Sequence, residues 1–355
     1  MTIDPKQNPT VPTRGTNDPT RPEPGKGDPD RPIPNPNPPS PPKGDGNTGG
    51  GDGPHYTPWL LVRYQPGDNG SRPLAPGSVF WESPDVWTQG SAGINQPVPG
   101  EPTKVFARIG NLGMQDATGV TVKYWWANPS IAISEATAHL IATDTVSIPA
   151  GNTLVFQSPA DWVPVVENGG HECLLVEAYI PVFDPLVSPM DPVDDRHVGQ
   201  KNEQLVIAQQ GQMFHIQLNA HNFTRTEQQV VVEARRALIP RNFAHKFAGR
   251  HEWAGPLLDP TLALPVQIAV GREPLRVVPS ARLLAAPLAA AVGGGCLPAP
   301  DAGATQVFRP GEVRTVNITG ALPPSAVRGE VYVTRVTQRI GNVITGGYTI
   351  YVTAA

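Results

Sequence analysis

The sequence predicts an all-β protein with two stacked-sheet domains behind a Pro- and Gly-rich arm. Short runs rich in β-branched and aromatic residues recur, Gly, Asn and Pro separate them about every ten residues, and apolar and polar residues alternate within them. The pattern is clearest between residues 96 and 202. We therefore expect an arm at 1–54, a first sandwich at 55–210 and a second at 211–355, with a Pro/Ala-rich insertion at about 238–303.

The arm is set apart by its composition. Residues 1–54 hold 15 prolines and nine glycines and contain no aromatic residue. Such a segment buries too little apolar surface to offset the entropy lost on ordering, so we expect it to be disordered. Its six Lys/Arg nearly balance its seven Asp/Glu. This balance argues against a tail that binds nucleic acid or membranes.

Alternation of side chains defines the strands of the first sandwich. Val105, Ala107 and Ile109 alternate with Lys104 and Phe106, as in a sheet that is buried on one side. About seven strands in roughly 110 residues are typical of an immunoglobulin-like fold. Strands are expected at residues 55–64, 78–81, 85–88, 103–109, 120–126, 139–148, 153–156, 161–163 and 171–180, and a strand at 204–207 is expected to close the sandwich.

The second half of the chain shows the same alternation, most clearly over residues 214–221. Gly341-Asn342 lies between the last two β-branched runs and predicts a hairpin turn, while Gly346-Gly347 predicts a bulge in the second arm of that hairpin. Strands are expected at residues 214–221, 229–234, 265–270, 313–319, 330–339 and 343–353, with a short helix near 280–284. These elements indicate a second β-sandwich with a long insertion.

Several segments of the first half, taken in order, resemble a known family. They are Ser83-Pro84-Asp85-Val86-Trp87 and residues 97–102, 105–113, 120–122, 148–151, 171–177 and 194–202. Together they resemble the bacterial cell-adhesion-related domain called CARDB, over roughly residues 83–202. The resemblance implies an immunoglobulin-like sandwich with an interaction or spacer role. It supplies no catalytic residue, and members of that family usually sit in exported proteins.

Net charge and targeting signals limit the expected partners and the expected location of the protein. A net charge of -4 and a pI near 6.1 imply no strongly charged partner. Residues 1–5 lack the basic region and the apolar core of a secretory signal, so we expect a cytoplasmic protein or one exported as part of an assembly. The longest apolar run, 283–292, is about half the roughly 20 residues of a membrane span. Cys173 and Cys296 are expected to remain unpaired.

An acidic loop is the candidate metal site. Asp184, Asp191, Asp194 and Asp195 cluster after the most apolar strand, and calcium binds six to eight such oxygen ligands in proteins. The sequence has no calcium-loop pattern around them. The alternative is that Asp194 and Asp195 accept hydrogen bonds from backbone N–H groups and so stabilise the turn.

Two groups of side chains are candidates for binding. Trp125 is the tryptophan that we expect to face outward, where it would stack on a sugar ring, and the alternative places it in the core. Arg241, Phe243, Lys246 and Phe247 form a basic and aromatic patch suited to another protein surface. The alternative for this patch is a solvated loop anchored by its two phenylalanines. Nucleic acid is disfavoured as a partner because the chain is acidic.

The motifs of common enzymes are missing from the sequence. It contains neither a Gly-x-Ser-x-Gly elbow nor a Gly-x-x-x-x-Gly-Lys phosphate loop. We therefore expect a non-catalytic structural or adhesion-type interaction module, in a bacterial surface or multi-subunit assembly, that acts through protein partners or self-assembly. The alternative is a carbohydrate- or surface-binding module with exposed aromatic side chains. An accessory domain of an enzyme system is the third hypothesis.

Overall fold

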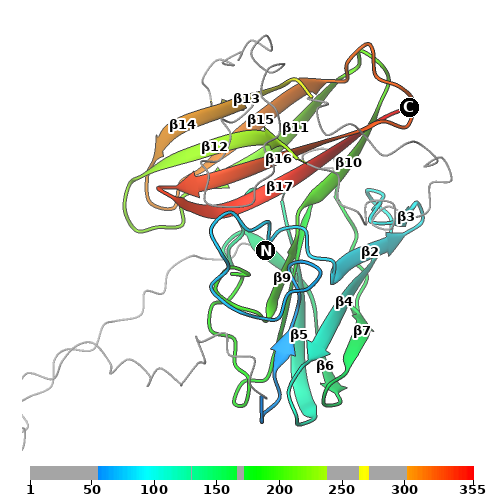
Figure 1. Ribbon diagram of the computed structural model, residues 1–355, viewed down its shortest axis with the longest axis vertical. Coiled ribbons are helices and arrows are strands. Elements are labelled where there is room, and N and C mark those ends of the chain that lie inside the picture. Colours follow the sequence, from blue (N-terminus) through cyan, green and yellow to red (C-terminus); the bar gives the residue numbers. More distant parts are fainter. Residues whose placement is uncertain (1–54, 129, 166–171, 238–263, 272–301) are drawn as a thin grey trace, which may run out of the picture. The chain divides into compact units, whose positions relative to one another are not determined.

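The computed structural model describes residues 55–128, 130–165, 172–237, 264–271 and 302–355. Within these ranges the secondary structure consists of strands joined by turns and loops, without a helix, and the predicted all-β class is confirmed (Figure 1). The arm at 1–54 and the short helix expected near 280–284 lie outside the described residues. The described strands form four sheets, which we treat as an N-terminal and a C-terminal pair.

The N-terminal pair encloses one hydrophobic core. Val105, Ala107 and Ile109 are buried, as their alternation predicts, and they pack with Val122 and Tyr124 of the facing sheet. One sheet contains β1 (Leu60–Leu61), β2 (Val86–Gly90), β3 (Gly93–Ile94), β4 (Lys104–Asn111) and β7 (Thr153–Gln157). The facing sheet contains β5 (Ala117–Ala127), β6 (Ala138–Ile148), β8 (Cys173–Tyr179) and β9 (Val198–Lys201).

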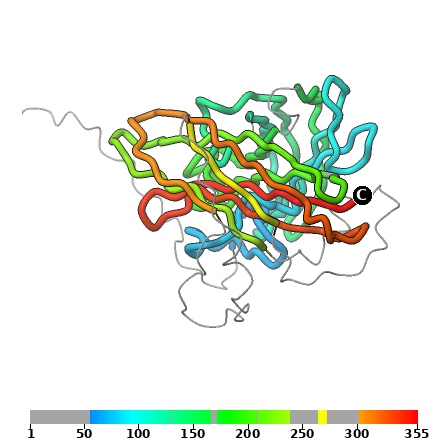
Figure 2. The backbone as a smooth tube through the Cα atoms, turned by 90° about the horizontal axis from the view of Figure 1, so that it is seen from above, coloured from blue at the N-terminus to red at the C-terminus, as the bar shows by residue number. Residues whose placement is uncertain are grey.

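The C-terminal pair encloses a second core, to which Leu218, Ile268, Phe308, Ile318 and Ile350 contribute. Its larger sheet runs in the order β10 (Glu203–Ala208), β17 (Val343–Ala354), β16 (Val331–Ile340), β12 (Gln228–Arg236) and β14 (Ala302–Phe308). Its smaller sheet runs in the order β11 (Met213–His221), β15 (Val313–Ala321) and β13 (Val266–Val270). Figure 2 shows this half from above, with β17 in red.

One strand assignment was wrong. The strand expected at 204–207 does not close the first sandwich: it is part of β10, which pairs in parallel with β17 over six register positions. Only Asn202 separates β10 from β9, so the chain passes from one sheet pair to the other almost without interruption (Figure 1). Local alternation identifies a strand but not the sheet edge that it joins, and the partner of β10 could therefore not be predicted from the sequence.

The last hairpin matches its prediction. Ile340 pairs with Val343 across the turn at Gly341-Asn342, and Gly341 has the positive φ of 59° that such turns favour. The register between β16 and β17 shifts where Gln338 faces Gly346 and Arg339 faces Ile344. Thr345 is therefore the extra residue of a bulge, immediately before the predicted glycine pair.

Candidate functional site

A buried polar cluster joins the two sheet pairs. Trp81, which is 1% exposed, donates from Nε1 to Thr349 Oγ1 at 3.0 Å. Thr349 Oγ1 donates in turn to Glu82 Oε1 at 2.6 Å. Arg335 grips both oxygens of Glu82, through Nε at 2.8 Å and Nη2 at 3.2 Å, in the fork geometry that favours arginine over lysine. Burial alone would lower the pKa of Arg335, but the charge of Glu82 more than offsets this and raises it.

Backbone contacts extend this junction on both sides of Asn202. The Asn202 N–H donates to the Trp81 carbonyl at 2.8 Å, and its own carbonyl accepts from the Thr349 N–H at 2.9 Å. Its side-chain Nδ2 donates to the Gly347 carbonyl at 3.1 Å. A second point of contact is Ile131, whose N–H donates to the Asn219 carbonyl at 2.9 Å and whose side chain lies in the C-terminal core. The two sheet pairs are thus hydrogen-bonded to each other through buried groups.

Two of the four predicted metal ligands surround a buried histidine instead. Asp195 Oδ1 lies 2.6 Å from His197 Nδ1, and Asp195 also accepts from the N–H groups of Val187 and Ser188. Asp184 Oδ2 accepts from the Leu60 N–H at 2.6 Å and lies 3.1 Å from His197 Nε2, close enough for an ion pair but not aligned as a hydrogen bond. Arg196 pairs with the other oxygen of Asp184. These contacts fasten the acidic loop to β1 and to the start of β9.

The backbone of Asp191 adjoins that cluster, because its carbonyl accepts from the Asp195 N–H at 2.9 Å. The side chain of Asp191 serves a turn, since its Oδ1 accepts from the N–H groups of Val193 and Asp194 at 2.9 and 3.4 Å. Burial, together with the charges of Asp194 and Asp195, raises the pKa of Asp191. In the part of the chain that the structure describes, no group of three or more His, Cys, Asp or Glu side chains is placed to hold a metal ion. Calcium binding by this loop stays a prediction.

Of the predicted binding residues, the structure describes Trp125 but not the basic and aromatic patch. Trp125 is half-buried, and its Nε1 donates to Glu177 Oε2 at 3.1 Å. Its ring packs beside the cluster of Leu175, Met190 and Val198, so only part of its surface is free to stack. The basic and aromatic patch at Arg241, Phe243, Lys246 and Phe247 lies outside the described residues. Cys173 is free and fully buried, and burial raises the pKa of its thiol to about 12.

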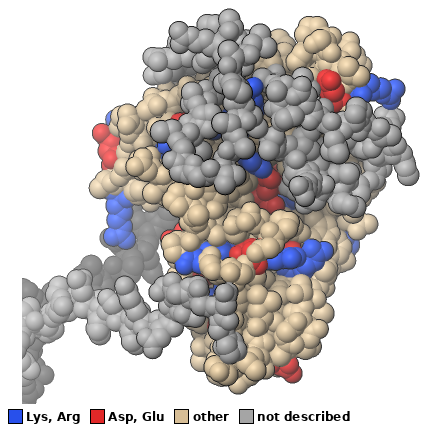
Figure 3. Space-filling model, in the orientation of Figure 1, with Lys and Arg blue, Asp and Glu red and all other residues tan. Residues whose placement is uncertain are grey.

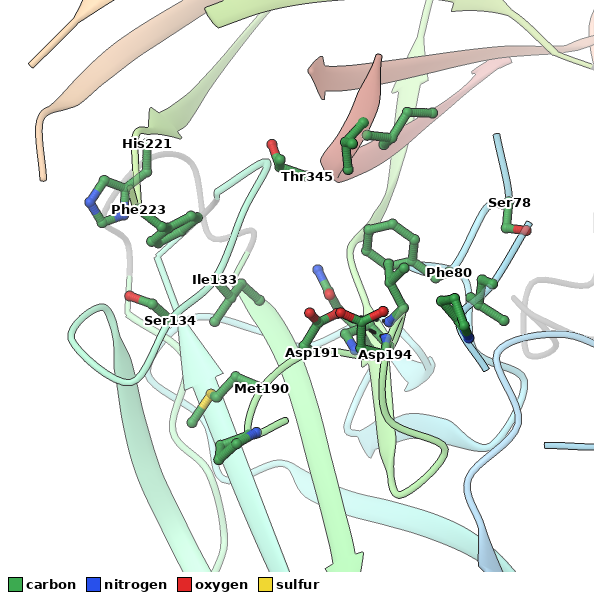
Figure 4. Close-up of a pocket in the computed structure, with 18 of the residues that line it drawn as sticks. Ser78, Phe80, Ile133, Ser134, Met190, Asp191, Asp194, His221, Phe223 and Thr345 are labelled. Atoms are coloured by element: carbon green, nitrogen blue, oxygen red, sulfur yellow. Dashed lines mark hydrogen bonds between the residues drawn. The ribbon is translucent and has the colours of Figure 1, made fainter. Parts of the chain in front are cut away.

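A pocket of 1170 Å³ lies beside the junction. Its walls come from seven separate parts of the chain, the longest of them residues 73–78 and 189–194. Phe80 and Phe223 lie on opposite sides of the space, with Ile133 between them and Met190 below Ile133 in the view of Figure 4. This size exceeds what most small ligands need, since typical ligand pockets measure about 300–1,000 Å³. The pocket is therefore large enough for a ligand.

The sequence did not reveal this pocket. Its residues come from turns and strand ends far apart in the chain, and none forms a local motif. The one available signal was the pair Asp191 and Asp194, which we assigned to a metal site together with Asp184 and Asp195. The structure places the first two in the pocket wall and the others around His197.

Comparison with known proteins shows likeness in parts only. No family model matches the chain, and no curated protein is similar to it. Among solved structures, a family 123 glycoside hydrolase from Clostridium perfringens matches 44% of this chain at 10% identity and a TM-score of 0.26, over 23% of its own length. A Paenibacillus cycloisomaltooligosaccharide glucanotransferase matches 37% at 17% identity and a TM-score of 0.22, over 16% of its length. The N-terminal domain of PorA matches 43% at 9% identity and a TM-score of 0.21, over 87% of its length.

These neighbours are β-rich, and at such TM-scores they assign no activity to this chain. The matched part spans less than a quarter of each of the two enzymes. Within the described ranges, the structure contains no helix with the length and apolar character needed to cross a bilayer.

Proposed function

We propose that this protein is a non-catalytic structural or adhesion-type module, with a CARDB-like first half, that works in a bacterial surface or multi-subunit assembly. The observation that carries the proposal is the parallel pairing of β10 with β17, from Glu203 opposite Thr349 to Ala208 opposite Ala354. This pairing makes the C-terminal sheet resistant to tension along the chain.

The resistance follows from the direction of the two strands. Tension from the N-terminal sheet pair enters β10 at Glu203, and tension from the C-terminal end enters β17 at Ala354. Because the strands are parallel, these forces point in opposite directions along the ladder. All six register positions are therefore loaded together in shear, and no end bond breaks first.

The junction passes this tension between the sheet pairs. Asn202 is 0% exposed, and its backbone bonds both to Trp81 and to Thr349, one residue before the start of the loaded ladder. The ion pair of Glu82 with Arg335 holds the same region from the side. On the face shown in Figure 3, basic side chains lie next to acidic ones. Such a mixed surface suits a protein partner better than a polyanionic partner such as nucleic acid.

Single-molecule force spectroscopy tests the proposal. The full chain is held through a tag at the exposed Tyr56 and a tag at Ala355, which loads the β10–β17 ladder in shear. In the control geometry, the second tag sits at the exposed turn residue Asn342, at the same end of the ladder as Glu203, so that β17 peels away. We expect a clearly higher unfolding force in the first geometry. Equal forces in the two geometries would contradict a tension-bearing role.

A further inference from the structure

The pocket carries charge of one sign. Glu135, Asp191 and Asp194 line it, and among the described lining residues none is lysine or arginine. Figure 4 shows the carboxylates of Asp191 and Asp194 side by side, pointing into the space between Ile133 and Phe80. Asp191 is partly buried next to the exposed carboxylate of Asp194, and burial together with that like charge raises the pKa of Asp191. A bound cation would relieve both costs.

The basic side chain of Arg72 contacts this loop but does not neutralise the wall. Arg72 reaches the loop only through a hydrogen bond from Nε to the Pro192 carbonyl at 3.0 Å. Its guanidinium is ion-paired with Asp68 at 3.1 Å.

Two buried polar groups in the pocket wall have a free hydrogen-bonding atom. His221 is 7% exposed, and its Nδ1 has no partner. Burial lowers the pKa of His221, while a hydrogen bond to the Gly311 backbone opposes that change. The neutral imidazole has one N–H donor and one acceptor nitrogen, so Nδ1 is available for a hydrogen bond with a ligand. Gln200 is 3% exposed and its amide Nε2 is likewise without a partner, so it is available as a donor.

The strands hold these two side chains in place. The His221 backbone is bonded on both sides by the side chain of Gln338, each bond at 2.8 Å. The ring of His221 packs on Phe223 at 3.9 Å between centroids. Gln200 lies in β9, opposite Leu175, and its carbonyl accepts from the Ser83 N–H. The free atoms therefore belong to groups that the fold has already positioned, as a binding site requires.

We propose that this pocket binds a small organic cation with an apolar body. Its ammonium N–H groups donate to Asp191 and Asp194, and a hydroxyl group at the other end of the apolar body hydrogen-bonds with His221 Nδ1. Its apolar body lies against Phe80, Phe223 and Ile133, where the ring faces also attract a cation. An oxygen on the ligand accepts from Gln200 Nε2. This site is separate from the β10–β17 ladder, so the cation-binding proposal can be tested independently of the tension-bearing role.

Three probes with one aromatic body test the charge requirement. Tyramine carries an ammonium group, tyrosol a hydroxyl group in its place, and 4-hydroxyphenylacetate a carboxylate. Isothermal titration of the full chain should show tyramine binding at least about tenfold more tightly than tyrosol, with no binding of the carboxylate. No binding of tyramine, equal binding of tyramine and tyrosol, or binding of calcium with exclusion of tyramine would overturn the proposal.

Matched variants locate the binding site. Asp191→Asn keeps the side-chain oxygen that accepts from Val193 and Asp194, so the turn survives while the charge is lost. We expect Asp191→Asn to weaken tyramine binding about tenfold and to leave tyrosol binding unchanged. Asp161→Asn removes the same charge from an exposed residue that pairs with Lys104 outside the pocket, and should bind tyramine like the unaltered chain. A similar loss in both variants, or in neither, would place the cation elsewhere.

Discussion

His197 is the most enclosed ionisable side chain of the acidic loop. It is 0% exposed and lies between the carboxylates of Asp195 and Asp184. Burial alone would lower the pKa of His197, but these two carboxylates raise it above 6.5. Burial alone would raise the pKa of Asp195, and its contacts with His197 and the Ser188 N–H lower it below 3.8. The charged pair is therefore a stabilising unit at intermediate pH.

The free energy of unfolding should depend on pH through the shifted pKa values of His197 and Asp195. The contribution of His197 is complete below pH 6.5 and is lost as the pH rises through its raised folded-state value. The contribution of Asp195 is complete above pH 3.8 and is lost as the pH falls through its lowered folded-state value. Urea unfolding between pH 4 and 9 should show the alkaline decline.

Replacement of the histidine tests this account. His197→Gln should lower the free energy of unfolding at pH 5 by about 3 kcal/mol, because it leaves the buried carboxylate of Asp195 without its cation, while Asp184 keeps Arg196. It should also flatten the alkaline decline. His215→Gln changes an exposed histidine on β11 and should keep the pH profile of the unaltered chain. An unchanged profile in His197→Gln would refute the assignment.

Two glycines of β17 lie where the strand approaches the N-terminal sheet pair too closely for a side chain. A Cβ added at Gly347 would lie 2.3 Å from Trp81 Cε2, and one added at Gly346 would lie 1.8 Å from the Ile131 carbonyl oxygen. Neither gap accepts a methyl group. The sequence linked this pair of glycines to a bulge, and the bulge is present next to them at Thr345. Their larger role is to let two sheets approach each other.

Gly347→Ala tests the close approach. The added methyl group must displace the Trp81 ring, so the free energy of unfolding should fall by about 1–3 kcal/mol. Val343→Ala alters a residue of the same strand that is 62% exposed and should change stability by no more than about 0.5 kcal/mol. Urea unfolding of both variants measures the difference. Equal effects would mean that the Trp81 contact is not tight.

The two sheet pairs depend on each other for burial. The core of the C-terminal pair includes Ile131 and Cys173, which come from the N-terminal half of the chain. Trp81 reaches across to Thr349, and β9 continues into β10 through Asn202. Loss of either pair would expose apolar surface of the other. Their unfolding should therefore be coupled.

Differential scanning calorimetry should show a single cooperative transition for both pairs. The van't Hoff and calorimetric enthalpies should agree, as they do for a two-state protein. Trp81→Ala removes the buried ring and its hydrogen bond, and should split the transition in two. Two transitions in the unaltered chain would show that the junction does not couple them.

Prediction succeeded where a property depends on neighbouring residues. The buried faces of β4 and β11 and the Gly341-Asn342 turn were all found from the sequence, because side chains in a strand alternate with a period of two. The pocket was missed because Phe80, Ile133 and Phe223 come from separate loops and strand ends. A turn role was named as the alternative for Asp194 and Asp195, and Asp195 accepts from the backbone N–H groups of Val187, Ser188 and His197. Gln200, in the pocket wall, had no local signal.

Local pattern settled the class of the fold, the faces that are buried and the last hairpin, since each of these depends on residues within a few positions of one another. Long-range contacts settled the partner of β10, the need for Gly346 and Gly347, and the grouping of Asp191 with His221. Trp81 and Thr349 are 268 positions apart, and an alternating pattern holds no information on which distant edge or ring a side chain will meet. Only packing of the folded chain brings such residues together.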